Sequence, residues 1–291
     1  MEIWTIQKLL DWTTEYFKKH NITWPHLEAE ILLAFCLQLK RIELYTDHDR
    51  ILGKTELDNF KALIKRRVNR EPIAYITGSQ PFMSLDFHVD RSVLIPRPET
   101  ELLAELVIEK IKETLNQRSP APTLLIADVG TGSGCIAVSL AKYLPAVKVF
   151  GLDNSDQAIV IAHKNAVRHN VEQRCQFKVG DMLAPLQEKV DVIVSNPPYI
   201  PSDQIEKLAE DVRIWEPRQA LDGGNDGLVR IKELLVSAPK HLNEAGEIFI
   251  EIGYDQGEAV KKLAAKNPAY KDIRIIKDLN KKDRILRASL A

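Results

Sequence analysis

The sequence is poor in cysteine and has no long hydrophobic run. Among its 291 residues are three cysteines, Cys36, Cys135 and Cys175, and no two of them form a Cys-x-x-Cys pair. An odd number at such spacings predicts neither a disulfide framework nor a zinc site. The longest apolar run, residues 31–37, is far too short to cross a bilayer.

A secretory signal and an excess of charge of either sign are also lacking. The first twenty residues include Glu2, Lys8, Asp11 and Glu15, which is not typical of a signal peptide. The chain has 40 Lys and Arg against 41 Asp and Glu, and the two signs also balance on either side of residue 90. Long nucleic acids usually need a basic surface. We therefore expect a reduced, cytoplasmic protein that binds neither a membrane nor long nucleic acid directly.

The sequence does have the length and the apolar content for two domains. Residues 1–72 predict an N-terminal helical domain. In it Pro25 can open a helix over residues 27–39, and Thr55 can cap another helix. The apolar face of that second helix comprises Leu57, Phe60, Ile64 and Val68.

A basic segment lies inside this helical part. Residues 61–70 contain five Lys and Arg and no acid. One interpretation is a solvated helix face, and the other is a contact for an acidic or RNA-bearing partner.

The pattern changes after the helices. From Tyr75 to Pro96 short β-prone pieces alternate with Gly and Pro, so residues 73–96 predict a β-hairpin linker. Residues 97–291 form the second predicted domain. It begins with a helix that runs through Ile111 and a polar loop at residues 116–122.

From residue 123 strands and helices alternate. Strands are predicted at 123–129, 147–152, 176–179, 190–195 and 247–252, with helices around 135–143, 156–169 and 226–241. Such alternation predicts an α/β fold, a Rossmann-like parallel sheet covered on both faces. Residues 273–277 and 284–289 predict an antiparallel pair at the end of that sheet.

A glycine-rich loop follows the first of these strands. Gly130, Gly132 and Gly134 stand where a strand turns into a helix, so backbone N–H groups can face a ligand. The spacing is not the dinucleotide fingerprint, and no P-loop Lys follows. Asp153 ends the next strand, where a carboxylate can accept both hydroxyls of a ribose. The alternatives are a plain strand–helix turn and a nicotinamide site.

Three further side chains belong to this candidate site. Asp128 precedes the first glycine, and a buried acid there suits a ligand that carries an amine or a positive charge. At the end of the third strand Asp181 could accept a hydrogen bond from an adenine amino group, and Met182 could pack on the ring. A turn acid and a core methionine are the alternative interpretation.

The most informative stretch is Asn196-Pro197-Pro198-Tyr199. Proline cannot donate to a sheet ladder, so the preceding strand must end here, and each proline keeps the residue before it extended. The Asn196 side-chain oxygen and the Pro197 carbonyl could accept both hydrogens of a planar NH₂ group, on which Tyr199 could stack. This arrangement suits an amide or aryl-amine nitrogen, whose delocalised lone pair must be oriented before it attacks. A proline-rich strand exit with a buried Tyr is the alternative.

Topology predicts that these two loops meet. In an open α/β sheet, ligands bind at the carboxyl ends of strands where the strand order reverses. The glycine strand is the first of the sheet and the Asn-Pro-Pro-Tyr strand is the fourth, so a strand order 3-2-1-4-5 makes them neighbours.

These motifs resemble those of class I S-adenosylmethionine-dependent methyltransferases that act on amino or amide nitrogen. The whole chain more closely resembles the release factor glutamine N5-methyltransferase family, whose members are peptide chain release factor methyltransferases. The Pro-Arg-Pro-Glu-Thr-Glu stretch before the glycine loop selects that family. The matching features are Tyr75, Gly78, Phe82, Val93-Leu-Ile-Pro-Arg-Pro-Glu-Thr-Glu101, Glu216-Pro217, Ala220-Leu221, Gly224, Asp226-Gly-Leu228 and Glu251-Ile-Gly253.

The resemblance implies transfer of a methyl group from S-adenosyl-L-methionine to the side-chain amide nitrogen (N5) of the glutamine in the Gly-Gly-Gln motif of class 1 peptide chain release factors. It implies a cofactor site of Asp128, Gly130, Thr131, Gly132, Ser133, Gly134, Asp153, Asp181, Met182 and Asn196. It assigns the glutamine to Asn196, Pro197, Pro198 and Tyr199, of which Asn196, Pro197 and Tyr199 are the catalytic candidates. It also implies that the helical domain, residues 1–72, serves substrate recognition.

Two other functions remain as alternatives. The enzyme alternative is a methyltransferase for amino groups of DNA adenine or rRNA guanine, which shares Asn-Pro-Pro-Tyr. The balanced charge and the lack of a basic target domain count against it. The other is a non-catalytic scaffold in a translation complex. No His pair has the spacing of metal ligands, so we expect no metal.

Overall fold

The computed structural model describes residues 3–117 and 123–291. The chain divides into two compact units. The helical unit comprises the residues up to Gly78 and the segment Ala209–Trp215, and the sheet unit comprises Ser79–Leu208 and Glu216–Ala291. Most of the polar loop expected at residues 116–122 lies outside the described residues.

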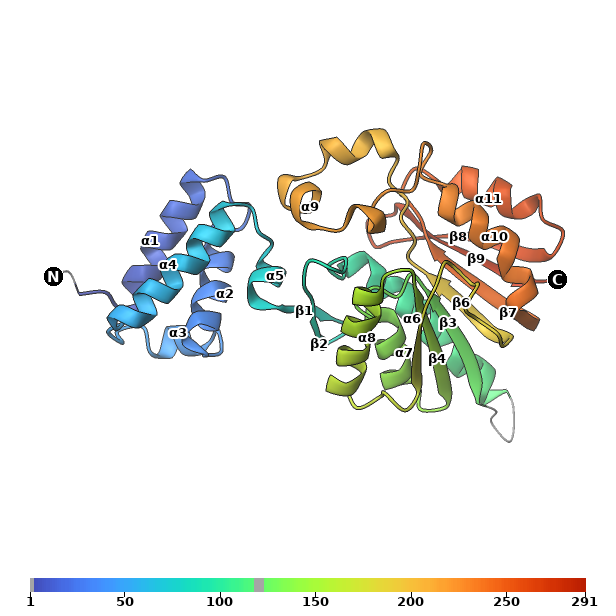
Figure 1. Cartoon of the computed structure of the whole chain (residues 1–291), viewed down its shortest axis with the longest axis horizontal. Helices are drawn as coiled ribbons and strands as arrows, with labels where there is room; N and C mark the ends of the chain where they lie inside the picture. The colour runs from blue at the N-terminus through green and yellow to red at the C-terminus, as the bar shows by residue number, and fades with distance from the viewer. Residues whose placement is uncertain (1–2, 118–122) are drawn as a thin grey trace. The chain divides into compact units, whose positions relative to one another are not determined.

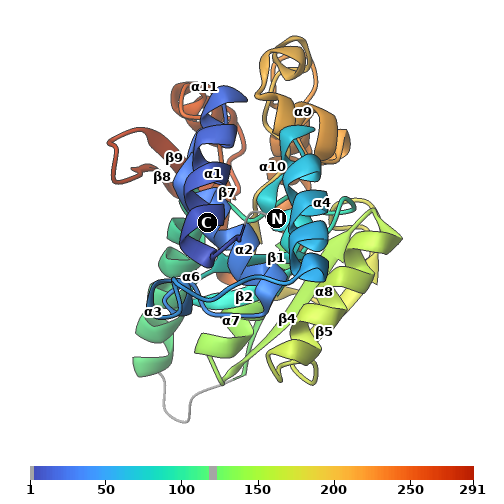
Figure 2. The same ribbon diagram turned by 90° about the vertical axis from the view of Figure 1, so that its left-hand side faces the viewer.

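The helical unit is a small helix bundle. Leu10, Leu32 and Phe60 are fully buried in its apolar core. Figure 2 shows the helices α1 (Ile6–Lys19), α2 (Pro25–Leu37) and α4 (Lys54–Val68) that carry them. Pro25 opens α2, as the sequence predicts. The helices of this unit are α1 (Ile6–Lys19), α2 (Pro25–Leu37), α3 (Glu43–Thr46), α4 (Lys54–Val68), α5 (Ile73–Thr77) and α9 (Glu210–Trp215).

Two local predictions in this region are wrong. Thr55 does not cap α4, because the helix already begins at Lys54, and the amide of Gly53 donates to the Glu56 carboxylate at 2.8 Å. The residues from Tyr75 to Thr77 are helical rather than β-prone, because the Pro72 carbonyl accepts from two successive amides and starts the short helix α5. The expected hairpin begins only after Gly78, as β1 (Ser79–Phe82) and β2 (Leu85–His88).

The basic segment 61–70 is partly neutralised within the helical unit. Arg67 is buried and pairs with Glu28 at 2.5 Å, and Arg66 pairs with Glu71 at 2.6 Å. Arg70 pairs with Glu210 of α9 at 3.0 Å. Three of its five cations therefore have internal carboxylate partners, an outcome that neither sequence interpretation included.

The sheet unit contains a seven-stranded, mostly parallel sheet in the order β5-β4-β3-β6-β7-β9-β8. The first five strands in this order are parallel, and β9 runs antiparallel between β7 and β8. Both the α/β fold and the order 3-2-1-4-5 are therefore confirmed. The strands are β3 (Leu124–Val129), β4 (Val147–Asp153), β5 (Cys175–Val179), β6 (Val190–Ser195), β7 (Leu242–Glu251), β8 (Tyr270–Lys277) and β9 (Asp283–Leu290).

Helices cover both faces of this sheet (Figure 1). On one face lie α6 (Pro98–Asn116), α7 (Cys135–Tyr143) and α8 (Asp156–Arg168), and on the other lie α10 (Val229–His241) and α11 (Gly257–Ala265). Short 3-10 turns occur at Ser202–Lys207 and Arg218–Ala220. Successive β3 residues point to opposite faces of the sheet, so Ile126 is buried in one apolar core and Ala127 in the other. This explains the continuous apolar runs in the sequence. None of the described helices is long and apolar enough to span a membrane.

Asn165 of α8 ties the hairpin to the glycine loop. This side chain is fully buried. Its amide donates to the carbonyls of His88 and Ser133, and its oxygen accepts from the His88 amide at 2.7 Å. One residue thus satisfies three backbone groups of two segments that lie far apart in the sequence.

We predict that Asn165→Leu destabilises the sheet unit, because three buried backbone groups lose their partner at once. The expected loss is about 3 kcal/mol in the free energy of unfolding, measured by urea denaturation and circular dichroism. Lys164→Leu, at the exposed neighbouring position of the same helix, is the control and should change stability by less than about 0.5 kcal/mol. Equal midpoints for the two variants would contradict this role for Asn165.

Candidate active site

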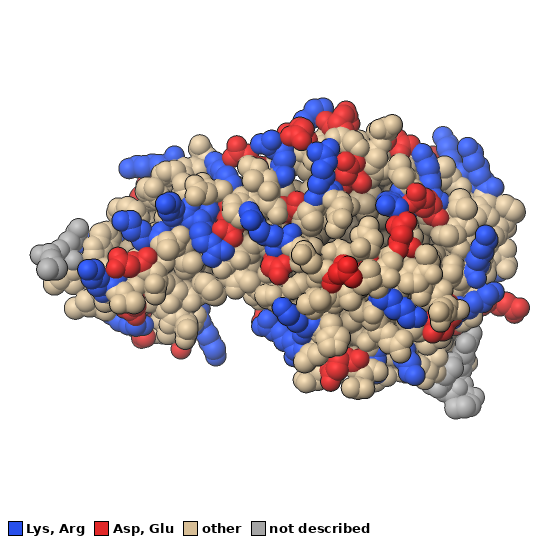
Figure 3. All heavy atoms as spheres, viewed as in Figure 1, with Lys and Arg blue, Asp and Glu red and all other residues tan. Residues whose placement is uncertain are grey.

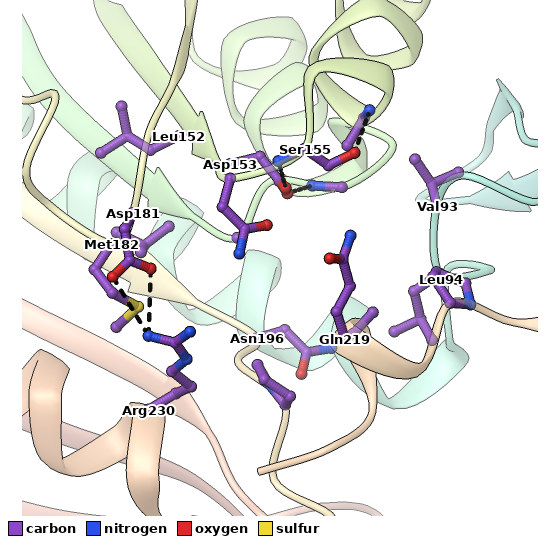
Figure 4. Close-up of a pocket in the computed structure, with 18 of the residues that line it drawn as sticks. Val93, Leu94, Leu152, Asp153, Ser155, Asp181, Met182, Asn196, Gln219 and Arg230 are labelled. Atoms are coloured by element: carbon purple, nitrogen blue, oxygen red, sulfur yellow. Dashed lines mark hydrogen bonds and ion pairs between the residues drawn. The ribbon is translucent and has the colours of Figure 1, made fainter. Parts of the chain in front are cut away.

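A pocket of about 240 Å³ lies at the carboxyl ends of β3, β4 and β6 in the sheet unit. Figure 4 shows Asp153 at the end of β4, Ser155 just beyond it, Met182 after β5 and Asn196 after β6 around the same space. These are the ends of neighbouring parallel strands, where the reversal of strand order opens a crevice.

The glycine loop forms one wall through backbone conformations that side chains disfavour. Gly130, Gly132 and Gly134 all have positive φ, between 53° and 77°. A Cβ at Gly132 would have no neighbour within 4 Å, so the chain here is open to the pocket. A Cβ at Gly134 would instead lie 3.0 Å from Cβ of Ala162, so this glycine lets α7 approach α8 closely.

Asp153 faces the pocket and also braces the glycine loop. One carboxylate oxygen accepts from the Gly132 amide at 2.9 Å, and the other accepts from the Ser155 amide at 3.0 Å. Burial raises the pKa of Asp153 and these backbone donors oppose the rise. A carboxylate has about four acceptor positions, so each oxygen can still accept a hydrogen bond from a ligand.

Asp128 lies behind the glycine loop rather than in the pocket wall. It is fully buried, and one oxygen accepts from the Thr131 hydroxyl at 2.7 Å and from the Ala137 amide at 3.1 Å. Burial raises the pKa of Asp128 to about 7. Its other oxygen has no hydrogen-bond partner among the described residues. The contacts present here are those of a group that shapes the loop.

Asp181 and Met182 close the pocket on the far side of β4. The Asp181 carboxylate pairs with Arg230 of α10 at 3.2 Å, and both side chains line the pocket (Figure 4). Met182 has φ 51° and is partly buried beside the apolar core of this face. The polar and apolar partners expected for a purine ring therefore occur side by side.

The Asn-Pro-Pro-Tyr loop is held from behind. The Ser195 hydroxyl donates to the Val129 carbonyl at 2.7 Å, which joins the ends of β6 and β3. The Gln256 side chain donates to the Tyr199 carbonyl at 2.9 Å. A Cβ at Gly227 would lie 2.3 Å from the same carbonyl, so only glycine fits against the loop there.

Some polar atoms of this loop have a hydrogen-bond partner and others do not. Nδ2 of Asn196 donates to the Thr100 hydroxyl at 3.0 Å. No described residue donates to Oδ1 of Asn196 or to the Pro197 carbonyl, which are thus two acceptors without a partner. The Tyr199 hydroxyl donates to Glu251 at 3.2 Å, and burial raises the pKa of Tyr199 well above its usual value.

The predicted site residues fall into two groups. Those that line the pocket are Gly130, Gly132, Asp153, Asp181, Met182, Asn196 and Pro198. Those that are not among the lining residues are Asp128, Thr131, Ser133, Gly134, Pro197 and Tyr199. Of these, Asp128 and Thr131 hydrogen-bond to each other within the glycine loop.

The sequence analysis missed several residues of this site. Val93, Leu94, Gln219 and Arg230 line the pocket (Figure 4). Val93 and Leu94 stand in a segment that matches the family, but nothing in the sequence assigned any of the four side chains to a ligand. Glu251, which ends the fifth strand of the sheet, had a usable signal. A carboxylate at the carboxyl end of a strand beside the Asn-Pro-Pro-Tyr strand is placed at the crevice by topology alone.

Two family models match the chain. Residues 8–78 match the PrmC N-terminal domain, and residues 104–231 match the methyltransferase small domain. Among solved structures, a methyltransferase from Pyrococcus furiosus shares 19% identity with a TM-score of 0.51 and covers 80% of this chain and 98% of its own. The hMettl16 catalytic domain shares 14% identity with a TM-score of 0.56 and covers 84% and 85%. At such identities these structures show the fold.

Full-length relatives are much more similar in sequence. The release factor glutamine methyltransferase of Geobacter sulfurreducens is 42% identical over 98% of this chain and 96% of its own length. The enzyme of the same description from Rhodopirellula baltica is 41% identical over 97% and 95%. Both matches span the helical part, the glycine loop and the Asn-Pro-Pro-Tyr loop, so this chain belongs to the release factor glutamine methyltransferase family.

Proposed function

We propose that this protein transfers a methyl group from S-adenosyl-L-methionine to the side-chain amide nitrogen of the glutamine in the Gly-Gly-Gln motif of class 1 peptide chain release factors. The observation that carries the proposal is the Asn196 amide, whose nitrogen is bound by Thr100 and whose oxygen is left for a ligand at the pocket. Family membership supplies the substrate class.

The pocket fits the cofactor by its chemistry. Asp153 offers free acceptor positions for two ribose hydroxyls, and the open backbone at Gly132 admits a ligand without a side-chain clash. Leu152 and Met182 supply apolar surface for a purine ring, and Asp181 supplies an acceptor for its amino group. In this assignment the Asp181 carboxylate accepts hydrogen bonds both from Arg230 and from the amino group of the ligand.

The chain's own part in the reaction is to orient the nitrogen. When bound, S-adenosylmethionine supplies a methyl group on a positively charged sulfur. An amide nitrogen is a poor nucleophile because its lone pair is delocalised into the carbonyl group. Oδ1 of Asn196 and the Pro197 carbonyl can accept its two hydrogens, and Tyr199 can stack on the amide plane. This fixes the lone pair toward the methyl group, which is a gain of orientation.

The partner is a translation factor rather than a nucleic acid. On the face in Figure 3 acidic and basic side chains are interspersed, and three of the five cations in residues 61–70 already have carboxylate partners. We assign contact with the release factor to the helical domain, residues 1–72. Residues 73–96 are the proposed linker, and residues 97–291 are the proposed methyltransferase domain. The cytoplasm, where release factors act, is the proposed location.

The deciding experiment is transfer of a labelled methyl group from S-adenosylmethionine to a purified class 1 release factor. Its Gly-Gly-Gln→Gly-Gly-Ala variant and total tRNA, rRNA and DNA are assayed beside it. We expect label on the wild-type factor alone. Label on a nucleic acid would instead establish the amino-group methyltransferase alternative. An intact fold with no measurable cofactor binding would favour a scaffold, and cofactor binding without any transfer would mean that the true substrate is missing from the assay.

We predict that Asn196→Ala lowers kcat for release factor methylation by about 10³-fold, because the amide nitrogen of the substrate loses a fixed acceptor. The measurement is single-turnover transfer of labelled methyl, with circular dichroism to show that the fold is intact. Asn243→Ala, which removes an amide that donates to Asp191 away from the pocket, is the control for the loss of a part-buried Asn. A rate for Asn196→Ala within a few-fold of wild type would remove this residue from the mechanism.

We predict that Asp153→Ala weakens S-adenosylmethionine binding by about 2–4 kcal/mol, because two hydrogen bonds to a charged acceptor are lost. Isothermal titration calorimetry measures the change in Kd. Asp153→Asn keeps the shape but only one of the two loop contacts, because its NH₂ group cannot accept from a backbone amide, and it should fall between wild type and Asp153→Ala. Asp156→Ala, at an exposed position three residues later, is the control. An unchanged Kd in Asp153→Ala would refute the ribose assignment.

A further inference from the structure

A continuous chain of hydrogen bonds runs behind the Asn-Pro-Pro-Tyr loop. Nδ2 of Asn196 donates to Oγ1 of Thr100 at 3.0 Å, and that hydroxyl donates to Glu251 at 2.7 Å. The second oxygen of Glu251 accepts from the Tyr199 hydroxyl at 3.2 Å. The carboxylate of one buried residue therefore connects both functional side chains of the loop.

The members of this chain come from three separate elements. Thr100 stands in the first turn of α6 and is 2% exposed, and Glu251 is the last residue of β7 and is 1% exposed. Asn196 and Tyr199 follow β6, which pairs with β7 in parallel. Each contact joins residues that are at least 52 positions apart in the sequence.

The chemistry of each donor and acceptor fixes the direction of the whole chain. An ionised carboxylate can only accept, so both hydroxyl protons must point at Glu251. The Thr100 oxygen can then only accept from Asn196, which must present its NH₂ group to it. A flipped Asn196 would bring its amide oxygen against the Thr100 oxygen, with no proton between them. The orientation with Oδ1 free is the one that satisfies every group.

We propose that Thr100 and Glu251 are positioning residues for methyl transfer. Through one hydrogen-bond chain they fix which atom of the Asn196 amide, Oδ1 rather than Nδ2, is presented to the substrate, and they fix the orientation of the Tyr199 ring. This inference rests on the proposed function and deepens it. It assigns a task to the Thr of Pro-Arg-Pro-Glu-Thr-Glu and to the Glu of Glu251-Ile-Gly253, neither of which lines the pocket.

Keeping the buried Glu251 ionised costs desolvation free energy, which argues against a role that consists only of holding α6 against β7. Burial raises the pKa of Glu251 to about 7, and the hydrogen bonds from Thr100 and Tyr199 oppose this rise. The charged groups that act on it are Arg284 of β9, which favours the ionised form, and Glu99 of α6, which disfavours it. Arg284 itself pairs with Asp278 at 3.1 Å. A neutral side chain would hold α6 to β7 without this desolvation cost.

The pH dependence distinguishes a positioning role of Glu251 from a purely structural role, because acidification should change the methyl transfer rate and the stability in opposite directions. Protonation turns one of the two Glu251 acceptors into a donor that faces the Thr100 or the Tyr199 hydroxyl, so the methyl transfer rate should fall as the pH drops below about 7. The folded-state pKa of Glu251 lies above the ordinary value of 4.5, so the folded state binds the proton more tightly than the unfolded state. The contribution of Glu251 to stability therefore increases over the same acidification, between about pH 7 and 4.5.

The first test compares Thr100→Val with Thr100→Ser. Valine keeps the volume and removes the hydroxyl, so kcat should fall about 100-fold, while Kd for S-adenosylmethionine stays within about threefold. Serine restores the hydroxyl and should recover most of the rate. Thr114→Val is the matched control, since Thr114 lies on the same helix and donates only to the Lys110 carbonyl. An unchanged kcat in Thr100→Val, or a Thr100→Ser variant as slow as Thr100→Val, would overturn the proposal.

The second test compares Glu251→Gln with Glu247→Gln, another buried acid of the same strand that pairs with Arg287. Glutamine must turn one donor toward Thr100 or Tyr199, so kcat should fall and the acidic limb assigned to Glu251 should disappear from the pH profile. Asp128 also has a pKa of about 7, so an acidic limb that persists unchanged in Glu251→Gln belongs to that group and overturns the assignment. Glu247→Gln should leave the profile unchanged.

A readout without turnover separates this inference from the proposed function. The two Nδ2 protons of Asn196, assigned in ¹⁵N-edited NMR spectra by their loss in Asn196→Asp, should shift in Thr100→Val and return in Thr100→Ser. Unshifted resonances in Thr100→Val would refute the hydrogen-bond chain whatever the substrate is. If the wild-type protein labels a nucleic acid rather than the release factor, the proposed function fails, and the same rate comparison is then made with that nucleic acid.

Discussion

The side-by-side pairing of β3 and β6 is the constraint on which the rest of the site depends. These strands are first and fourth in the sheet's chain order, yet Ile126–Val129 pairs in parallel with Val192–Ser195. The Ser195 hydroxyl locks the two ends together through the Val129 carbonyl. Because both strands point the same way, the glycine loop and the Asn-Pro-Pro-Tyr loop leave the sheet at one edge. A shift of register at this pair would separate the cofactor wall from Asn196.

Each of these two loops is supported from behind by one buried acid. Asp128 accepts from Thr131 and from the first turn of α7, and Glu251 accepts from Thr100 and Tyr199. Burial raises the pKa of both acids to about 7, and the hydrogen bonds that each acid accepts oppose this rise, together with the Arg284 charge at Glu251. Such a group acts as a fixed acceptor that directs nearby donors. The polar side chains that face the pocket are therefore oriented by atoms that no ligand reaches.

The sequence was sufficient for the sheet and for the loops that leave it, because both depend on local signals. Apolar runs marked the strands, and glycine and proline at their ends marked where backbone geometry must change. The start of α4, the helix α5 and the grouping of Ala209–Trp215 with the helical unit were not predicted. The first two follow from local hydrogen bonds at Gly53 and Pro72 that no apolar pattern marks, and the third brings together distant residues such as Arg70 and Glu210. The bond from Thr100 to Glu251 spans 151 positions, and no single-sequence pattern identifies that partner.

The contacts around Asn196 also explain why the proposed reaction needs no general base. Burial and the nearby Glu251 charge raise the pKa of Tyr199, so it remains a phenol whose proton is already donated. Glu251 is separated from Asn196 by the Thr100 hydroxyl and has both oxygens occupied by donors. Neither group can take a proton from the substrate nitrogen without breaking the chain that orients it. A methylated amide nitrogen carries an acidic proton that water can remove, so the protein's contribution to the rate is orientation.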